Sequence, residues 1–229
     1  MHPSLEPPDL RPPCPDLEPA GPSCPVCGRT VHGPFPVCFC CRSTSRQLAL
    51  PLVPVVVTVE YRVGDDRHHR LRRYKDAPTP ETRAHHRAAL VAHLGLWMAD
   101  HDLEVRRRTG CWSVVTAVPS TRRSGPTPAE ALIDGVPVLA ERHLRLLGRG
   151  SGTLDHLQAA RDGFTPLPGV DRAGLDGLPV LVFDDSITTG ARAQSAAAAL
   201  RLAGARVVGI LAVGRALAPT APLPPTLGG

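Results

Sequence analysis

Several residue types and sequence patterns are scarce or missing in this chain of 229 residues. Aromatic residues make up 3% of it, asparagine does not occur, and Lys75 is the only lysine. There is no Gly-x-x-x-x-Gly-Lys motif, which excludes a Walker-type P-loop. There is also no run of about 18 apolar residues, so we expect no transmembrane helix. The N-terminus lacks the basic start and apolar core of a signal peptide, and we therefore expect a cytoplasmic protein.

The residues that are present set the class of protein. Hydrophobic residues make up 42% of the chain, which is enough for a core, and the net charge of +5 favours anionic ligands. Nearly all of the positive charge is arginine, so the compact ammonium of Lys75 stands out, although chance survival of one lysine codon is the alternative. Seven cysteines without a secretion signal indicate a metal site or reduced thiols rather than a disulfide framework.

Four of the cysteines form two Cys-x-x-Cys pairs near the N-terminus. They are Cys24, Cys27, Cys38 and Cys41. Each pair makes a tight turn that brings two thiolates to one side, and two such turns complete a tetrahedron around zinc. So short a segment cannot build a core, so bound metal would supply its folding energy. Cys40 is a fifth thiol and His32 a competing ligand, and free or redox-active cysteines are the alternative. We predict a structural zinc-ribbon-like module over residues 24–45.

The rest of the chain alternates between strand-like and helix-like patterns. Apolar or β-branched runs at 53–61, 113–118, 180–183 and 207–213 predict four strands. Thr79, Pro80 and Glu81 predict the start of a helix whose buried face carries Leu90 and Leu94. Further helices are expected at 129–147 and at 191–203, with a loop-rich segment at 148–177 between them. This alternation predicts an α/β domain over 48–215 with a mostly parallel sheet flanked by helices.

Proline-rich segments with little apolar content lie at both ends of the chain. They span residues 1–23, where Cys14 stands alone, and residues 216–229. Neither segment can bury enough apolar surface to offset its ordering entropy, so we predict two disordered tails.

Residues 180–191 are the most informative stretch of the chain. Four apolar residues precede Asp184 and Asp185, and a hydroxyl-rich turn with Gly190 leads into an alanine-rich helix. A strand, a turn and a helix N-terminus in this order form a site for a phosphate. Carboxylates repel a phosphate but accept hydrogen bonds from hydroxyl groups, so the pattern predicts a sugar phosphate. An acidic strand end followed by a capped helix is the alternative.

Three groups are expected at the carboxyl edge of the sheet, where open α/β sheets bind ligands. They are the acidic pair Asp184 and Asp185, the turn at 118–122 that follows the second strand, and the basic end of the stretch 67–75. We expect them to form one site.

The acidic stretch resembles the ribose-phosphate loop of type I phosphoribosyltransferases. Together with the four cysteines, Lys75 and the Val118-Pro119 turn, the chain over 24–215 is similar to the ComF-type competence proteins, whose catalytic domain resembles amidophosphoribosyltransferases. This resemblance implies a type I phosphoribosyltransferase fold that binds 5-phosphoribosyl 1-pyrophosphate with magnesium. It implies that Asp184 and Asp185 hold the ribose hydroxyls and that Lys75 and Arg122 act at the pyrophosphate.

The resemblance also assigns the substrate-binding residues. The pyrophosphate turn consists of Pro119, Ser120 and Thr121, and the 5-phosphate loop consists of Ser186, Ile187, Thr188, Thr189, Gly190 and Ala191. Two other functions stay open. One is a non-catalytic ComF-like adaptor in DNA uptake or processing, whose basic stretch 67–75 faces nucleic acid or a protein partner. The other is a regulator that senses the ligand without turnover.

Overall fold

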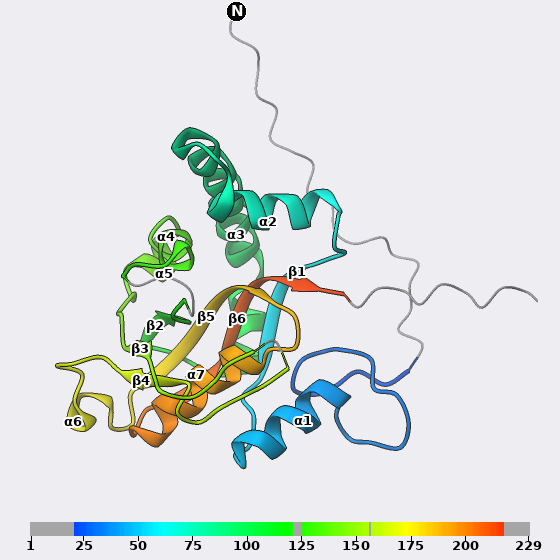
Figure 1. Cartoon of the computed structure of the whole chain (residues 1–229), viewed down its shortest axis with the longest axis vertical. Helices are drawn as coiled ribbons and strands as arrows, with labels where there is room; N and C mark the ends of the chain where they lie inside the picture. Colours follow the sequence, from blue (N-terminus) through cyan, green and yellow to red (C-terminus); the bar gives the residue numbers. More distant parts are fainter. Residues whose placement is uncertain (1–20, 121–124, 156, 218–229) are drawn as a thin grey trace, which may run out of the picture.

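Helices and strands alternate along the chain in the computed structural model, which describes residues 21–120, 125–155 and 157–217 (Figure 1). In order, the elements are α1 (Phe39–Leu48), β1 (Val55–Tyr61), α2 (Asp66–Asp76), α3 (Pro80–Thr109), β2 (Val114–Ala117), α4 (Pro128–Ile133), α5 (Pro137–Ala140), β3 (Leu147–Arg149), β4 (Phe164–Pro166), α6 (Arg172–Leu175), β5 (Pro179–Ile187), α7 (Ala191–Leu202) and β6 (Arg206–Ala216). The four predicted strands are confirmed as β1, β2, β5 and β6. The predicted tails lie largely outside the described residues, and β6 ends at Ala216.

The main sheet has four strands in the order β1-β6-β5-β2, and every neighbouring pair is parallel. The short strands β3 and β4 form a separate antiparallel pair. Parallel strands end at the same edge, so the carboxyl ends of β2 and β5 lie side by side, with Ala117 paired to Phe183. The predicted α/β architecture with a mostly parallel sheet is therefore confirmed.

Each face of the sheet is covered by helices, because successive side chains of a strand point to opposite sides. Along β5, Val180 and Val182 pack with α7 and the cysteine segment, whereas Leu181 and Phe183 pack with α3 and α4 (Figure 1). All four side chains are fully buried. Burial of a side chain of this size contributes roughly 1.5–3 kcal/mol. The small alanine side chains on the buried face of α7 let this helix lie close against the sheet.

Helices α2 and α3 form a hairpin that carries the basic stretch. The Asp65 side chain accepts a hydrogen bond from His68 N at 2.7 Å and starts α2. Thr79 starts α3 in the same way, with Pro80 as the first helical residue, so the predicted helix start is confirmed. The hairpin brings the last turn of α2 to the edge of the sheet. Among the described residues, no helix combines the length and the apolar character needed to cross a membrane.

The helix predicted over 129–147 is wrong. The segment instead forms α4 and α5, and Leu147 already belongs to β3. Pro137 has no N–H to continue the helical hydrogen bonds, so a new helix begins there. Gly135 lies between the two helices, where an added Cβ would come within 2.5 Å of Val91 in α3. The break therefore permits a close approach to α3.

Candidate functional site

A cleft of about 550 Å³ lies at the carboxyl edge of the sheet. It is bounded by the ends of β2 and β5, the last turn of α2, and the first turns of α4 and α7. Its lining residues are Lys75, Asp76, Val118, Ser120, Thr127, Pro128, Ala129, Leu154, Asp155, Asp184, Asp185, Ser186, Ile187, Thr188, Thr189, Gly190, Ala191, Arg192 and Ala193. The three sequence-predicted groups thus meet in one cavity.

The strand predicted over 180–183 ends before the two acidic residues, whereas in the structure both residues lie within the strand. Strand β5 continues to Ile187, and Asp184 and Asp185 are only 6% and 7% exposed. The strand continues because β6 pairs with it beyond Phe183, as far as Ile187 and Arg215. Both carboxyl groups are therefore held by rigid sheet backbone and still line the cleft.

Asp185 is compensated by two side chains from α2. The hydroxyl of Tyr74 donates a hydrogen bond to Oδ2 of Asp185, and Nζ of Lys75 lies 2.7 Å from Oδ1. Burial raises the pKa of Tyr74 well above its usual value, so its hydroxyl keeps the proton that it donates. The single lysine of the chain therefore lies at the site and neutralises the Asp185 charge.

Asp184 has a different environment. Its Oδ1 accepts a hydrogen bond from the backbone N–H of Asp185 at 3.0 Å. Burial raises the pKa of Asp184 to about 7, and the nearby charge of Asp185 adds to this rise. The positive charges of Arg192 and Lys75 oppose it. At physiological pH the carboxyl group of Asp184 is therefore partly protonated, and its oxygen atoms can accept hydrogen bonds from a ligand.

The segment from Ser186 to Gly190 turns from β5 into α7 and lines the cleft throughout. Gly190 precedes the helix with φ +83°, a left-handed conformation that other residues rarely adopt. Gly190 has no side chain that could cap the start of α7. The backbone N–H of Ala191 instead donates a hydrogen bond to Thr189 Oγ1, at 3.3 Å. The positive end of the helix dipole therefore faces a polar turn, which suits a phosphate group.

Two further side chains organise the site, and sequence reasoning missed both. Tyr61, the last residue of β1, lies with its hydroxyl 2.5 Å from Ser186 Oγ. Arg192 lies in the first turn of α7 and donates from Nη2 to the carbonyl of Pro119 at 3.1 Å. A cation in the first turn of a helix opposes the helix dipole. That unfavourable placement was the signal in the sequence that could have identified Arg192.

The predicted pyrophosphate turn is only partly described. Ser120 lines the cleft, and Pro119 contacts Arg192 beside it. Thr121 and Arg122 lie outside the described residues. The wall formed by α4 and by Leu154 and Asp155 was not predicted, because no motif marks it.

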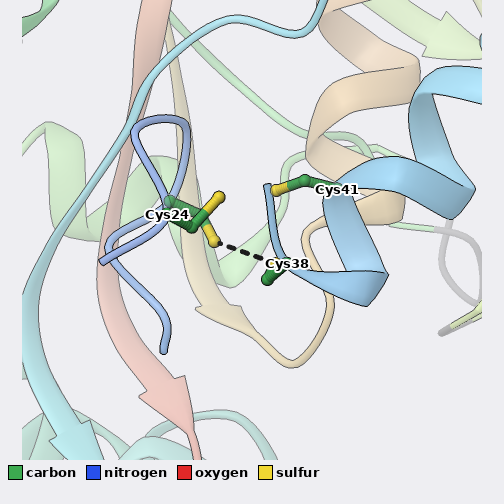
Figure 2. A group of neighbouring side chains, drawn as sticks. Cys24, Cys38 and Cys41 are labelled. Atoms are coloured by element: carbon green, nitrogen blue, oxygen red, sulfur yellow. Dashed lines mark hydrogen bonds between the residues drawn. The ribbon is translucent and has the colours of Figure 1, made fainter. Parts of the chain in front are cut away.

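The four predicted cysteines form one buried cluster. The sulfur atoms all lie within 4.8 Å of one another, and they belong to Cys24, Cys27, Cys38 and Cys41. Cys24 comes from the loop before α1, and Cys38 and Cys41 come from the start of α1 (Figure 2). The first turn is closed by hydrogen bonds between Cys24 and Gly28 and between Cys24 and Arg29. His32 is not part of the cluster, and Cys40 is partly exposed outside it.

The four thiols lie so close together that ionising all of them requires a compensating positive charge. A hydrogen bond with Cys41 lowers the pKa of Cys27 to about 5, and the same bond raises the pKa of Cys41. Burial raises the pKa of Cys38 to about 11. Cys38 and Cys41 therefore resist ionisation by themselves, whereas a metal ion would stabilise their thiolates. Four close thiols can hold such an ion.

No protein-family model and no curated protein matches this chain. The fold alone does not determine a function, since α/β sheets of this kind carry many activities. The chemistry of the cleft and of the cysteine cluster therefore carries the functional argument. These two features are a buried acidic pair beside a phosphate-type turn, and a cluster of four thiols that can hold a metal ion.

Proposed function

We propose that the cleft binds 5-phosphoribosyl 1-pyrophosphate with magnesium, and that the chain is a phosphoribosyltransferase-like protein of the type I fold. One observation carries this proposal. The buried pair Asp184 and Asp185 leads directly into the turn at 186–190 and the N-terminus of α7, and all of them line the same cleft. An acceptor of hydroxyl hydrogen bonds next to an anion site matches a sugar that carries a phosphate.

Each part of the cleft has a role in this proposal. The turn at 186–190 and the amide groups at the start of α7 would bind the 5-phosphate, with Arg192 adding positive charge. Asp184 and Asp185 would accept hydrogen bonds from the ribose hydroxyls. Lys75 would hold Asp185 in place from the opposite wall, because its ammonium lies 2.7 Å from that carboxylate. Fixed geometry of this kind lowers the entropy that the reaction must lose.

The proposed reaction exchanges one bond at C1 of the ribose. The bond to the pyrophosphate oxygen breaks, its electron pair leaves with pyrophosphate, and the lone pair of an acceptor such as an amine forms the new bond to C1. Magnesium carried by the pyrophosphate would supply charge neutralisation of the leaving group. Lys75 would add positive charge that the protein holds in advance. The two aspartates would orient the sugar and would not act as nucleophiles.

We assign zinc to the four-cysteine cluster, with a structural role. Four thiolates are a donor set that structural zinc sites use, and complete tetrahedral coordination leaves no position for a substrate. The cluster is buried behind the sheet edge rather than open to the cleft, since none of its cysteines lines the cleft. Among the described residues it is the one group of three or more potential ligands close enough to bind a metal ion.

Calorimetric titration of the purified protein tests the proposed ligand. We expect binding of 5-phosphoribosyl 1-pyrophosphate in the presence of magnesium, and weaker binding of inorganic phosphate, which lacks the sugar. Pyrophosphate release measured with a panel of amine and nucleobase acceptors then tests turnover. Absence of binding would contradict the proposal. Binding without pyrophosphate release for any acceptor would favour the ligand-sensing regulator instead.

A second candidate is the adaptor function, and the basic face of the α2–α3 hairpin favours it. Arg72 and Arg73 are exposed on α2, and Arg87 is exposed on α3. A surface that binds a nucleic-acid backbone loses affinity steeply as salt rises, because bound counterions are released. Binding of DNA measured from low to high salt tests this candidate. We expect weak, non-specific DNA binding, which charge reversal at Arg72 and Arg73 should abolish. DNA binding that does not depend on salt, or no binding at low salt, would contradict the adaptor function.

A further inference from the structure

The first cysteine turn is tied to the turn that follows β5. Arg29 is two residues after Cys27, and its Nη2 donates a hydrogen bond to the carbonyl of Thr188. The same nitrogen donates to the carbonyl of Ala216, at the end of β6, at 3.0 Å. One guanidinium group thus connects the cysteine segment to the cleft-lining turn and to the sheet.

A second arginine makes the reverse connection. Arg215, in β6, is 3% exposed and donates from Nη2 to the carbonyl of Cys27. Its Nη1 lies 3.1 Å from Oε1 of Glu60 in β1, which balances its charge. The two arginines therefore reach in opposite directions across the same contact. Because both bind backbone carbonyl groups, the contact fixes main-chain positions rather than flexible side chains.

Little space separates the cysteine cluster from the turn. A gap of about 10 Å³ lies between them, with Cys27 and Cys41 on one side and Thr188, Thr189 and Gly190 on the other. It is no larger than the space for one water molecule. Figure 2 shows the turn between β5 and α7 passing beside the cluster. A change in the shape of the cluster must therefore move the turn or open a cavity behind it.

We propose that the metal-bound cysteine cluster positions the turn at 186–190 and that Arg29 is the residue that transmits this effect. The bound metal fixes the Cys24–Cys27 turn, the turn fixes the Arg29 backbone, and the Arg29 side chain holds the Thr188 carbonyl. Loss of the metal then loosens the phosphate-binding turn. The part of this inference that concerns ligand affinity rests on the proposed function, whereas the part that concerns the order of the turn does not.

Amide hydrogen exchange of residues 186–191 tests the structural part. We compare the wild type with Arg29→Ala and with a matched control, Arg46→Ala. Arg46 is an exposed arginine in the last turn of α1, the helix that carries Cys41. Opening of a segment sets its exchange rate. Loss of the Arg29 hydrogen bonds should raise exchange of 186–191 about tenfold, with zinc content unchanged. Removal of the metal with a chelator should raise it at least as much.

A conservative variant separates positioning from a general loss of structure. In Arg29→Lys one ammonium can still donate to the Thr188 carbonyl, so exchange should fall between the wild type and Arg29→Ala. Exchange at residues 180–185 of β5 and 207–214 of β6 should stay at the wild-type rate in all variants. Equal exchange of residues 186–191 in Arg29→Ala and Arg46→Ala would overturn the proposal. No change in this exchange on metal removal would overturn it as well.

Ligand binding supplies the second readout, because coupling between two sites is reciprocal. In Arg29→Ala, affinity for 5-phosphoribosyl 1-pyrophosphate with magnesium should fall about tenfold, and saturating ribose 5-phosphate should slow zinc release to a chelator in the wild type. Arg46→Ala should match the wild type in both measurements. Absence of ligand binding to the wild type would reject the proposed function, and the exchange experiment would still decide whether the cluster positions the turn.

Discussion

The cysteine cluster and the cleft both bury ionisable groups, and they compensate for them in different ways. In the cluster, ligands from one short segment, Cys24 to Cys41, face one another and can share a cation. In the cleft, Asp185 is paired with Tyr74 and Lys75 from α2, whereas Asp184 accepts its hydrogen bond from the backbone N–H of Asp185. A buried carboxyl group with a strongly raised pKa is characteristic of functional sites. The comparison thus distinguishes a region whose buried groups face one another from one that leaves a carboxyl group facing a cleft.

The two regions also differ in what assembles them. The spacing of the cysteines already places four thiols together, and bound metal can order that segment alone. The cleft forms only when β2, β5, α2, α4 and α7 have packed, because its lining residues come from all of these elements. Mutations in the cleft should therefore act across several elements. Mutations in the cluster should act on the cysteine segment and, through Arg29, on the turn at 186–190.

Loss of one metal ligand should have the largest effect. In Cys27→Ser the metal loses a thiolate, and zinc content should fall from about one equivalent to near zero, since structural zinc sites need all four ligands. Metal analysis measures this, and circular dichroism should show that the sheet survives.

Cys40→Ser is the matched control for the cluster. Cys40 lies in the same segment, partly exposed and outside the cluster, so this variant should keep its zinc. Equal loss of metal in both variants, or a wild type purified under reducing conditions without zinc, would contradict the four-cysteine assignment.

Asp185→Asn should damage both binding and folding. It removes the charge that pairs with Lys75 and accepts the Tyr74 hydrogen bond, so the free energy of unfolding should fall by about 1–3 kcal/mol. Affinity for the sugar phosphate should fall about tenfold or more. Urea unfolding and calorimetry measure the two effects. Asp102→Asn, which removes the charge of the partly exposed pair with Arg106 on α3, should change neither by a comparable amount.

Asp184→Asn should weaken binding about tenfold and yet stabilise the fold at high pH. A carboxyl group whose folded pKa is raised stabilises the folded state at low pH, and this contribution is lost as pH rises from its ordinary pKa near 4 through about 7. The asparagine variant does not lose it. Its free energy of unfolding should therefore match the wild type near pH 4 and exceed it by roughly 1–3 kcal/mol at pH 8. Urea unfolding of both proteins over this pH range measures the effect. If the difference in free energy of unfolding between them does not change with pH, the raised pKa of Asp184 is wrong.

The cluster and the sheet were predictable from the sequence because their signals are local. Cysteine spacing placed the four thiols, and apolar runs such as 180–183 marked the strands. The prediction of a single helix over 129–147 was wrong because the apolar residues extend across Pro137, where the structure begins a new helix. Helix α1 was not predicted either, since its buried side depends on packing against the cysteines and α7.

The environment of the acidic pair was less predictable. The order of residues at 180–191 placed both carboxyl groups beside a phosphate-type turn, and the structure keeps them together there. Their burial, and the difference between them, depend on Tyr74 and Lys75 arriving from an element more than a hundred positions away in the chain. The tie from Arg29 to the Thr188 carbonyl also lies between distant segments. Such contacts leave no periodic pattern in a sequence.

The smallest effect should come from Thr189→Val, which keeps the branched shape and removes one hydroxyl. That hydroxyl accepts the hydrogen bond from Ala191 N at the start of α7, so the free energy of unfolding should fall by about 0.5–1 kcal/mol. Affinity for the sugar phosphate should fall about threefold to tenfold, because the hydroxyl also faces the proposed phosphate site. Calorimetry and urea unfolding measure both quantities.

Thr189→Ser separates these two contributions from a change of shape. Serine keeps a hydroxyl that can accept from Ala191 N and loses only the methyl group, so affinity and stability should both return close to the wild-type values. If the serine variant binds as weakly as the valine variant, the methyl group contributes to binding as well as the hydroxyl. If the valine variant binds as tightly as the wild type, the Thr189 hydroxyl serves only to start α7 and does not contact the ligand.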